Sequence, residues 1–294
     1  MSLRLVPPLP AGTPGDPGLT GPGSVTWRVA RERVVPLGGL SALLLQLAHP
    51  LVAAGVAEHS SVRGDPTQRL MLTLEMLLVT TFGDVPQVGE MARRIASIHR
   101  VVRGSLPHEI GEWPAGTPYS AASPELCLWV YATIIETCLN SYATFVGPLD
   151  SSERAEFYRE SERWGQLYGV GPDVRPASYE AFQDYYTSML ARLRPGDQAR
   201  SVARLVLRAR LRGIPIAPGS YLLAAGLVPA PLRAQYGLRW SAAHRTLWWL
   251  FTRAVRVVMG RLAPARIRFW DQYRVAVTRC GAAATRNAAP DPAR

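Results

Sequence analysis

An uncharged apolar stretch at residues 34–57 limits most strongly what this chain can fold into. By length alone it could cross a bilayer as one helix. Pro50, however, lacks an amide proton and clashes with the preceding helical turn, so a helix should end or kink at about His49. The pattern therefore favours two buried helices, 40–48 and 51–60, with a membrane-spanning segment as the alternative.

The rest of the chain is also patterned for helices. Apolar residues recur at helical spacing, and no strand-like alternation of useful length is present. The phosphate-binding and nucleophile-elbow patterns GxGxxG, GxxxxGK[ST] and GxSxG are missing from the sequence. Further helices are expected at 27–33, from 66 past 80, and at 86–104, 124–146, 150–168, 179–190, 196–213, 241–258 and 263–279, with a loop at 105–123.

These patterns predict an all-α fold in one multi-helix domain. We place the domain at residues 25–281, between a disordered Pro/Gly-rich leader at 1–24 and a flexible tail at 282–294. The leader lacks the unbroken apolar core of a signal peptide. We therefore expect a cytoplasmic protein without a transmembrane span.

The charge of the chain is strongly basic but needs no polyanionic partner. The net charge is +11, and all 33 basic residues are arginine, as in proteins from genomes rich in G and C. Nucleic acid is therefore not an expected partner, although a basic surface can steer anionic ligands or touch acidic lipid headgroups. The three cysteines are widely spaced and predict neither a disulfide framework nor a zinc knuckle.

Five histidines are the candidate metal ligands: His49, His59, His99, His108 and His244. None follows an acidic residue by three positions, so the Glu-x-x-His pairs of di-iron bundles are absent from the sequence. His108-Glu109 does not continue into HExxH, and no CxxCH is present for covalent haem attachment. These absences leave an imidazole ligand to non-covalent haem as the redox interpretation.

Three blocks in the first half place histidine, arginine and threonine beside helix-patterned apolar residues. They read QLAHPLVAAGVAEHS (46–60), DPTQRLMLT (65–73) and ASIHRVVRG (96–104). A haem pocket needs this combination, because porphyrin is a large apolar plate with one metal to ligate and two carboxylates to neutralise. The blocks resemble the catalytic domain of the rubber-oxygenase (latex-clearing protein) family, which includes the prenyl-cleaving oxygenases of mycophenolic acid synthesis. The resemblance extends over roughly residues 27–275.

The resemblance implies a b-type haem enclosed between helices, with His99 as its iron ligand. His99 matches the histidine of the family's haem-ligating helix, whereas on the residues alone it could equally be a hydrogen-bonded core histidine. Arg69 and Thr73 resemble the family's distal arginine and threonine. Arg69 would bond a haem propionate or iron-bound dioxygen, and Thr73 would donate into the pocket. An ion pair at the surface and core packing are their respective alternatives.

Three further residues are expected near the cofactor. His59 is the third candidate catalytic residue, and His49 and Arg103 are candidate cofactor contacts, Arg103 by neutralising a propionate. Their structural alternatives stay open: His49 as a group that caps or bonds the broken helix, and Arg103 as part of a solvated helix face.

The sequence departs from the family at two positions. The family's distal lysine falls on Leu72, and the chain has no lysine at all, so the sixth iron position should be open, bound by water or taken by a histidine. Where many bacterial relatives have histidine in the long helix, this chain has Tyr131. Tyr131 could bond a substrate or line its tunnel, or it could simply be part of the core.

The predicted function is that of a haem b-dependent oxygenase. It would use dioxygen and iron to oxidise, or to cleave at a carbon–carbon double bond, a small and largely apolar metabolite. The alternative is a non-catalytic haem- or lipid-binding carrier or sensor, and a more distant one is a helical module that contacts nucleic acid. The expected partners are the substrate and dioxygen, and a homodimer stays open.

Overall fold

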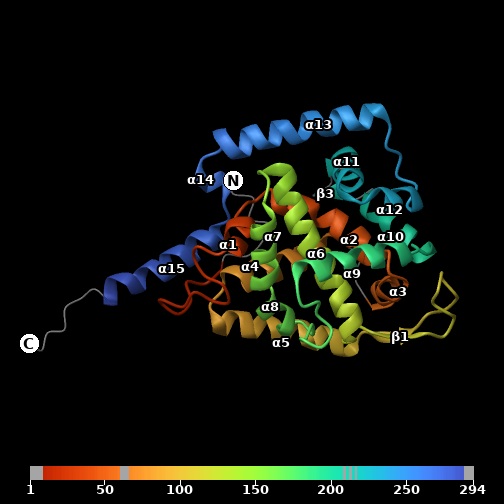
Figure 1. Ribbon diagram of the computed structural model, residues 1–294, viewed down its shortest axis with the longest axis horizontal. Helices are drawn as coiled ribbons and strands as arrows, with labels where there is room; N and C mark the ends of the chain where they lie inside the picture. The colour runs from red at the N-terminus through yellow and green to blue at the C-terminus, as the bar shows by residue number, and fades with distance from the viewer. Residues whose placement is uncertain (1–8, 60–65, 208–209, 212–213, 216, 288–294) are drawn as a thin grey trace, which may run out of the picture.

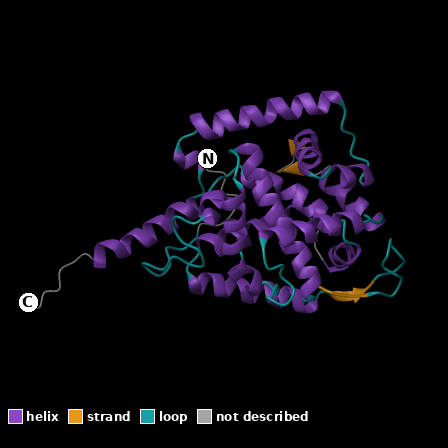
Figure 2. Cartoon of the chain, viewed as in Figure 1, coloured by secondary structure: helices purple, strands orange, loops and turns teal. Residues whose placement is uncertain are grey.

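The computed structural model describes residues 9–59, 66–207, 210–211, 214–215 and 217–287. The described chain is mostly helical (Figures 1 and 2), which confirms the predicted fold class. Its α-helices are α1 (Val25–Ala30), α2 (Gly39–Leu47), α3 (Pro50–His59), α4 (Pro66–Phe82), α5 (Val85–Val101), α6 (Pro124–Phe145), α7 (Ser151–Glu160), α8 (Glu162–Leu167), α9 (Tyr179–Arg192), α10 (Asp197–Leu207), α11 (Ala217–Leu227), α12 (Ala230–Gln235), α13 (Ala242–Val257), α14 (Ala265–Arg268) and α15 (Asp271–Asn287). A 3-10 turn (Val35–Gly38) leads into α2, and a π turn (Val258–Leu262) follows α13.

The centre of the molecule is α6, which other helices surround (Figure 1). Most of its residues between Leu126 and Phe145 are buried, on all sides of the helix. Trp129 is completely buried, and its Nε1 donates to the backbone oxygen of Leu45 on α2 at 3.2 Å. Gln46 Nε2 donates to Thr133 Oγ1, also at 3.2 Å. These two hydrogen bonds hold α2 against α6.

The predicted break at Pro50 is confirmed. The segment Val35–Leu47 meets α3 at 107°. Residues 50–57 of α3 are all buried against other parts of the protein. No single helix within the described ranges is long and apolar enough to span a bilayer, although this bent pair meets the length and composition criteria together.

The region after α5 differs from the prediction. The helix expected at 86–104 ends at Val101, and an antiparallel hairpin of β1 (Arg103–Ser105) and β2 (Pro118–Ser120) occupies the expected loop. A second hairpin, β3 (Arg210–Leu211) and β4 (Ile214–Pro215), replaces the end of the helix expected at 196–213. Strands of two or three residues are too short to show alternation in a sequence.

The two chain ends also differ from the prediction. Residues 9–24, expected as a disordered leader, contact the body of the protein. The Thr13 amide donates to Asp84 Oδ2 at 2.6 Å, and Arg279 Nε donates to the Asp16 carbonyl at 2.8 Å. Of the expected tail, 282–287 continue α15, and 288–294 lie outside the described residues.

Candidate functional site

The helices α4 and α5 form an antiparallel pair that carries three of the six predicted site residues: Arg69, Thr73 and His99. Asp84 caps α5: its side chain accepts from the Gln87 amide at 2.9 Å, and the Gln87 side chain accepts from the Asp84 amide. Glu75 and Arg94 form an ion pair across the two helices at 3.0 Å. In antiparallel helices this pairing fixes the register, so the turn of α4 that contains Arg69 lies level with the last turn of α5.

His99 lies on the inward face of α5. Val88, Met91 and Ile95 are buried and follow one another at helical spacing, and His99 comes one turn after Ile95. Its side chain is half-buried, whereas the neighbouring Ile98 is 38% exposed. The apolar spacing in the sequence predicts a stripe of Val88, Met91, Ile95, Ile98 and Val102, with His99 beside it. The structure reverses these positions, so that His99 itself continues the stripe.

A second histidine meets the end of this helix. His59 is the last residue of α3, and its Nε2 lies 2.9 Å from the backbone oxygen of Arg103, four residues after His99. The Tyr119 hydroxyl of β2 donates to Glu58 Oε2 at 2.5 Å, and its ring meets the edge of the His59 ring. The last turn of α5, the end of α3 and the β1–β2 hairpin therefore form one region, which we call the His99 corner.

Of the two predicted site residues on α4, the structure describes only the side chain of Thr73. Thr73 is half-buried, and Met76 and Thr80, on the same face, are buried. The backbone of Arg69 belongs to α4, but its side chain lies outside the described part of the structure. The predicted roles of Arg69 and Thr73 therefore stay predictions.

The small residues of α3 are covered by protein. A Cβ atom added to Gly55 would meet the Tyr119 ring and Val102 Cγ1, each at 3.4 Å. From the sequence, the small residues Ala53, Ala54, Gly55 and Ala57 permit the close approach of another helix or a flat ligand. The hairpin and the end of α5 take that place instead. Tyr119 and Glu58 were missed from the sequence, because a single tyrosine in an expected loop gives no pattern.

His49 lies at the opposite end of α3, about 15 Å from His59 along the helix axis. It is buried, its ring lies 5.0 Å from that of Trp113, and its Nδ1 has no hydrogen-bond partner among the described residues. Burial lowers the pKa of His49 to about 4, with a further contribution from the Arg192 guanidinium and an opposing one from Glu112. The structure therefore does not bring His49 into the His99 corner.

Tyr131 lies in the core. Its hydroxyl is 2.5 Å from Ser161 Oγ and accepts from Arg175 Nε at 3.2 Å, and its ring packs against Trp164. Burial raises the pKa of Tyr131, so the phenol stays protonated. The network ties α6 to Ser161, which lies at the break between α7 and α8 where one helix was expected. Of the two sequence interpretations, the structure favours the core role.

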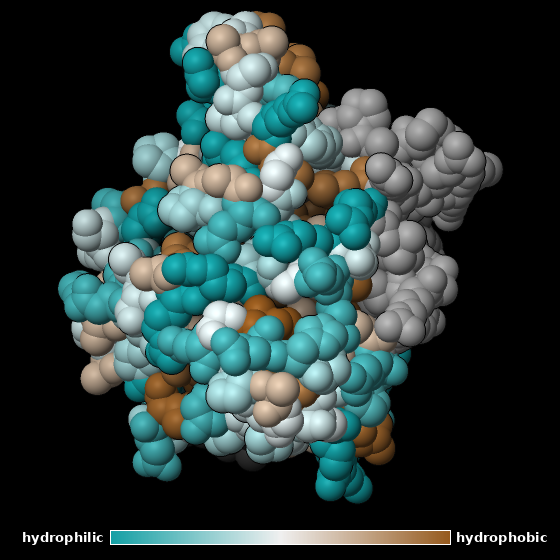
Figure 3. Space-filling view, turned by 90° about the vertical axis from the view of Figure 1, so that its right-hand side faces the viewer, coloured by the Kyte–Doolittle hydropathy of each residue, from teal (hydrophilic) through white to brown (hydrophobic). Residues whose placement is uncertain are grey.

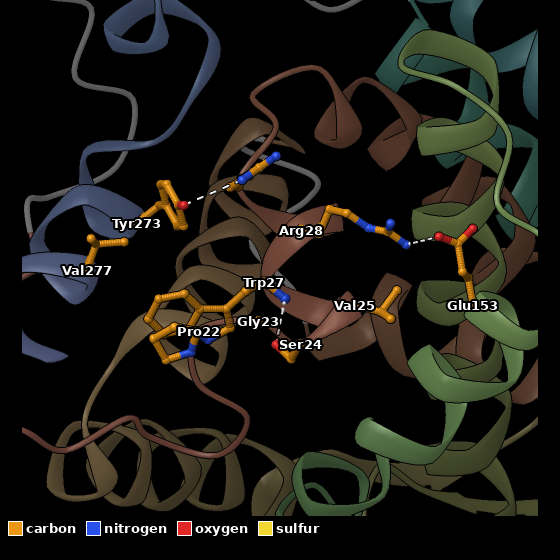
Figure 4. Close-up of a pocket in the computed structure, with 10 residues that line it drawn as sticks. Pro22, Gly23, Ser24, Val25, Trp27, Arg28, Glu153, Tyr273 and Val277 are labelled. Carbon is orange, nitrogen blue, oxygen red and sulfur yellow. Dashed lines mark hydrogen bonds and ion pairs between the residues drawn. The ribbon is translucent and has the colours of Figure 1, made fainter. Parts of the chain in front are cut away.

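Two hollows lie near these elements. An enclosed apolar cavity of about 50 Å³ lies beside α4, where Thr80 Oγ1 and the Tyr168 hydroxyl are 2.7 Å apart. It is too small for a metabolite or a porphyrin, which need several hundred cubic ångströms. A more open cleft of about 360 Å³ lies between α1, α7 and α15 (Figure 4), where Arg28 and Glu153 form an ion pair at 2.6 Å. None of the predicted site residues lines this cleft.

The histidines, cysteines and carboxylates do not otherwise suggest a metal site. Within the part of the chain that the structure describes, no three of them lie close enough together to hold a metal ion. The one described region that joins several predicted residues is the His99 corner.

Comparison with known proteins places the chain among oxygenases. Two uncharacterized proteins, one from Mycobacterium bovis and one from Mycobacterium tuberculosis, are each 26% identical to it over 233 residues, which are 76% of this chain and 88% of theirs. No solved structure matches the chain. A family model described as "ER-bound oxygenase mpaB/B'/Rubber oxygenase, catalytic domain" matches residues 27–258, so the chain belongs to this oxygenase family.

Proposed function

We propose that this protein is a haem b-dependent oxygenase that uses dioxygen to oxidise a small, largely apolar substrate. The observation that carries the proposal is the position of His99. It continues the buried stripe of α5 at the corner where the ends of α3 and α5 meet. Membership of the oxygenase family supports the reaction class.

The donor set at the His99 corner fits a haem. His99 supplies one half-buried imidazole beside the apolar Met91 and Ile95, and the exposed Arg100 and Arg103 supply cations for the propionates. This is the combination that a b-type haem requires: one axial ligand, apolar walls and charge at the edge. When bound, the haem would supply the iron that activates dioxygen.

His59, Arg69 and Thr73 would donate and accept hydrogen bonds at the site, and His59 could also accept a proton. A carbonyl oxygen only accepts, so the contact with the Arg103 oxygen requires the proton of a neutral His59 on Nε2. Nδ1 of His59 can then accept a proton. We assign Arg69 and Thr73 as hydrogen-bond donors in the part of the site where dioxygen would bind. Leu72 replaces the family's lysine, which leaves no amine to occupy the sixth iron position.

An absorption spectrum of the purified full-length protein tests the proposal. A strong Soret band is expected, together with ready binding of carbon monoxide or cyanide. Arg69→Ala should slow oxygen consumption per haem more than it lowers haem content, because a donor used mainly in the activated state contributes chiefly to rate. Loss of haem with an unchanged rate per haem would assign Arg69 to a propionate instead.

Oxygen uptake separates the oxygenase from a carrier or sensor. The reduced protein should consume dioxygen with short prenyl compounds and not with polar amino acids, because the α5 stripe that contains His99 is apolar. A haem protein that consumes no dioxygen with any substrate in such a series would be a carrier. A protein without a Soret band would contradict both assignments.

A further inference from the structure

The helix α13 stands apart from the rest of the protein. It lies along the top of the molecule in Figure 1, and none of its residues is buried. One side touches the body, where Trp248 and Phe251 meet the ring of Phe145 at 5.8 and 6.1 Å. In the space-filling view of Figure 3, which is turned about the vertical axis, α13 is seen from its end and projects above the body of the protein. The residues of α13 that turn away from these rings are exposed.

The uncovered side of α13 is apolar. Leu247, Leu250, Val257 and Val258 are 54%, 52%, 44% and 49% exposed, and Leu262 in the π turn is 70% exposed. At 100° per residue, Leu247, Leu250, Val257 and Val258 fall within one arc of about 100°, which begins beside Phe251 and turns away from Trp248. Exposed apolar side chains that form a continuous stripe, rather than scattered points, mark a surface that binds something.

The segment is rich in arginine and lacks acidic residues, and Arg253 borders the stripe. Two of its arginines already have partners in the protein: Arg256 donates to carbonyl oxygens at the end of α6, and Arg268 pairs with Glu32. Residues 237–270 contain no Asp or Glu and seven arginines: Arg239, Arg245, Arg253, Arg256, Arg261, Arg266 and Arg268. Trp249 is 53% exposed, and the Arg253 guanidinium lies 4.7 Å from the centre of its ring. An open groove of about 620 Å³ runs beside it, lined by Asn140, Thr252, Arg253 and Arg256 among others. The flank of the helix is therefore basic and amphipathic.

We propose that α13 and the following π turn bind the surface of an anionic lipid bilayer. An interfacial helix has an apolar face that enters the acyl boundary, tryptophan at the headgroup level and arginine beside the phosphates. In Figure 1 no other element lies beyond α13 on its outer side, so a planar surface can approach along its length. The groove beside Trp249 accepts a headgroup. This inference does not depend on haem binding.

The charge pattern selects the lipid surface over a second copy of the chain. If two α13 helices packed through their apolar stripes, the arginines of both copies would face one another with no carboxylate from the helix to pair them. Like charges at such an interface are unfavourable. Anionic headgroups, in contrast, supply many mobile negative charges to the same arginines.

Vesicle flotation of the full-length protein tests the proposal. The probes are phosphatidylcholine vesicles and vesicles in which one-third of the lipid is phosphatidylglycerol. The wild type should float with the anionic vesicles only, and high salt should release it. Leu250→Gln should lower the partition coefficient about tenfold, because the side chain no longer enters the apolar layer. Arg253→Gln and Arg261→Gln should each lower it about fivefold.

The matched control is Val85→Gln, which changes an equally exposed apolar residue (56%) at the start of α5. It should float like the wild type, and circular dichroism should show that all variants fold. Failure of the wild type to float with anionic vesicles would overturn the proposal. So would equal flotation of Leu250→Gln. A dimer by light scattering that Leu250→Gln converts to a monomer, without any vesicle binding, would assign the stripe to a second copy instead.

Discussion

A histidine lies at each end of α3, and the surroundings of the two differ. His49 is buried against Trp113, and its Nδ1 has no described hydrogen-bond partner. His59 is exposed, hydrogen-bonded to the Arg103 carbonyl, and next to the turn that contains His99. The comparison shows that the more buried of the two histidines is not the one that lies near His99. The more buried ring is packed as a neutral core group, whereas the more exposed ring lies where the predicted site residues meet.

The difference follows from what each end of the helix packs against. The first end joins α2 at the Pro50 bend, and this bent pair packs against α6. The second end meets a two-stranded hairpin, which covers Gly55 but leaves His59 at the edge. A closed end resists substitution, whereas an open end tolerates it. The predictions below test this contrast.

The largest expected effect is the pH dependence of stability at the closed end. Below pH 6.5 the unfolded chain protonates His49, whereas the folded ring stays neutral until about pH 4. The unfolded state therefore binds more protons in this window, and stability falls as the pH is lowered through it. At about 1.4 kcal/mol per pH unit, the loss is about 3 kcal/mol. Urea denaturation of the wild type and of His49→Gln at pH 7 and pH 4.5 measures it.

The His49→Gln variant should lose much less stability between these two pH values than the wild type. The matched control is His59→Gln at the open end, which should follow the wild-type profile. If both variants changed the profile equally, the contrast between the two ends would be wrong.

A smaller effect is expected from a single added methyl group where the bent pair of helices packs against α6. A Cβ at Gly38, which leads into α2, would lie 2.1 Å from Ser141 Oγ and 2.6 Å from Thr137 Cγ2 on α6. Both side chains are buried and cannot move into solvent. Gly38→Ala should therefore lower the free energy of unfolding by about 2 kcal/mol. Gly147→Ala, where no atom lies within 4 Å, is the control and should leave stability unchanged or slightly higher.

The smallest effect is expected at the open end. Tyr119→Phe removes the hydrogen bond to Glu58, whose carboxylate is exposed and can bond water instead. The cost should be at most about 1 kcal/mol by thermal denaturation. A loss as large as that of Gly38→Ala would show that the hairpin end is as tightly packed as the closed end.

Much of the fold could be predicted from the sequence because its signals are local. Pro50 fixed the position of the bend, and continuous apolar spacing predicted the central helix α6. The covering of Gly55 could not be predicted, since it depends on Tyr119, which comes 64 residues later in the chain, in strands of three residues. The burial of His49 likewise depends on Trp113.

The site was predicted in part. The family resemblance pointed to His99, but the apolar Ile98 beside it shifted the expected face of α5 by one residue. Only the folded helix shows that Ile98 is exposed and that His99 continues the stripe. The His59 ring contacts the backbone oxygen of Arg103, whereas His49 lies against Trp113 at the other end of α3. The roles of Arg69 and Thr73 stay predictions.

The central claim, that the His99 corner holds a haem through His99, is tested most directly by haem content. The Soret absorbance per protein should be measured for the wild type, His99→Ala and the exposed His108→Ala. We expect the wild type and His108→Ala to retain one haem with the same band, and His99→Ala to lose the haem or shift its band. Full haem content with an unchanged band in His99→Ala would contradict the account.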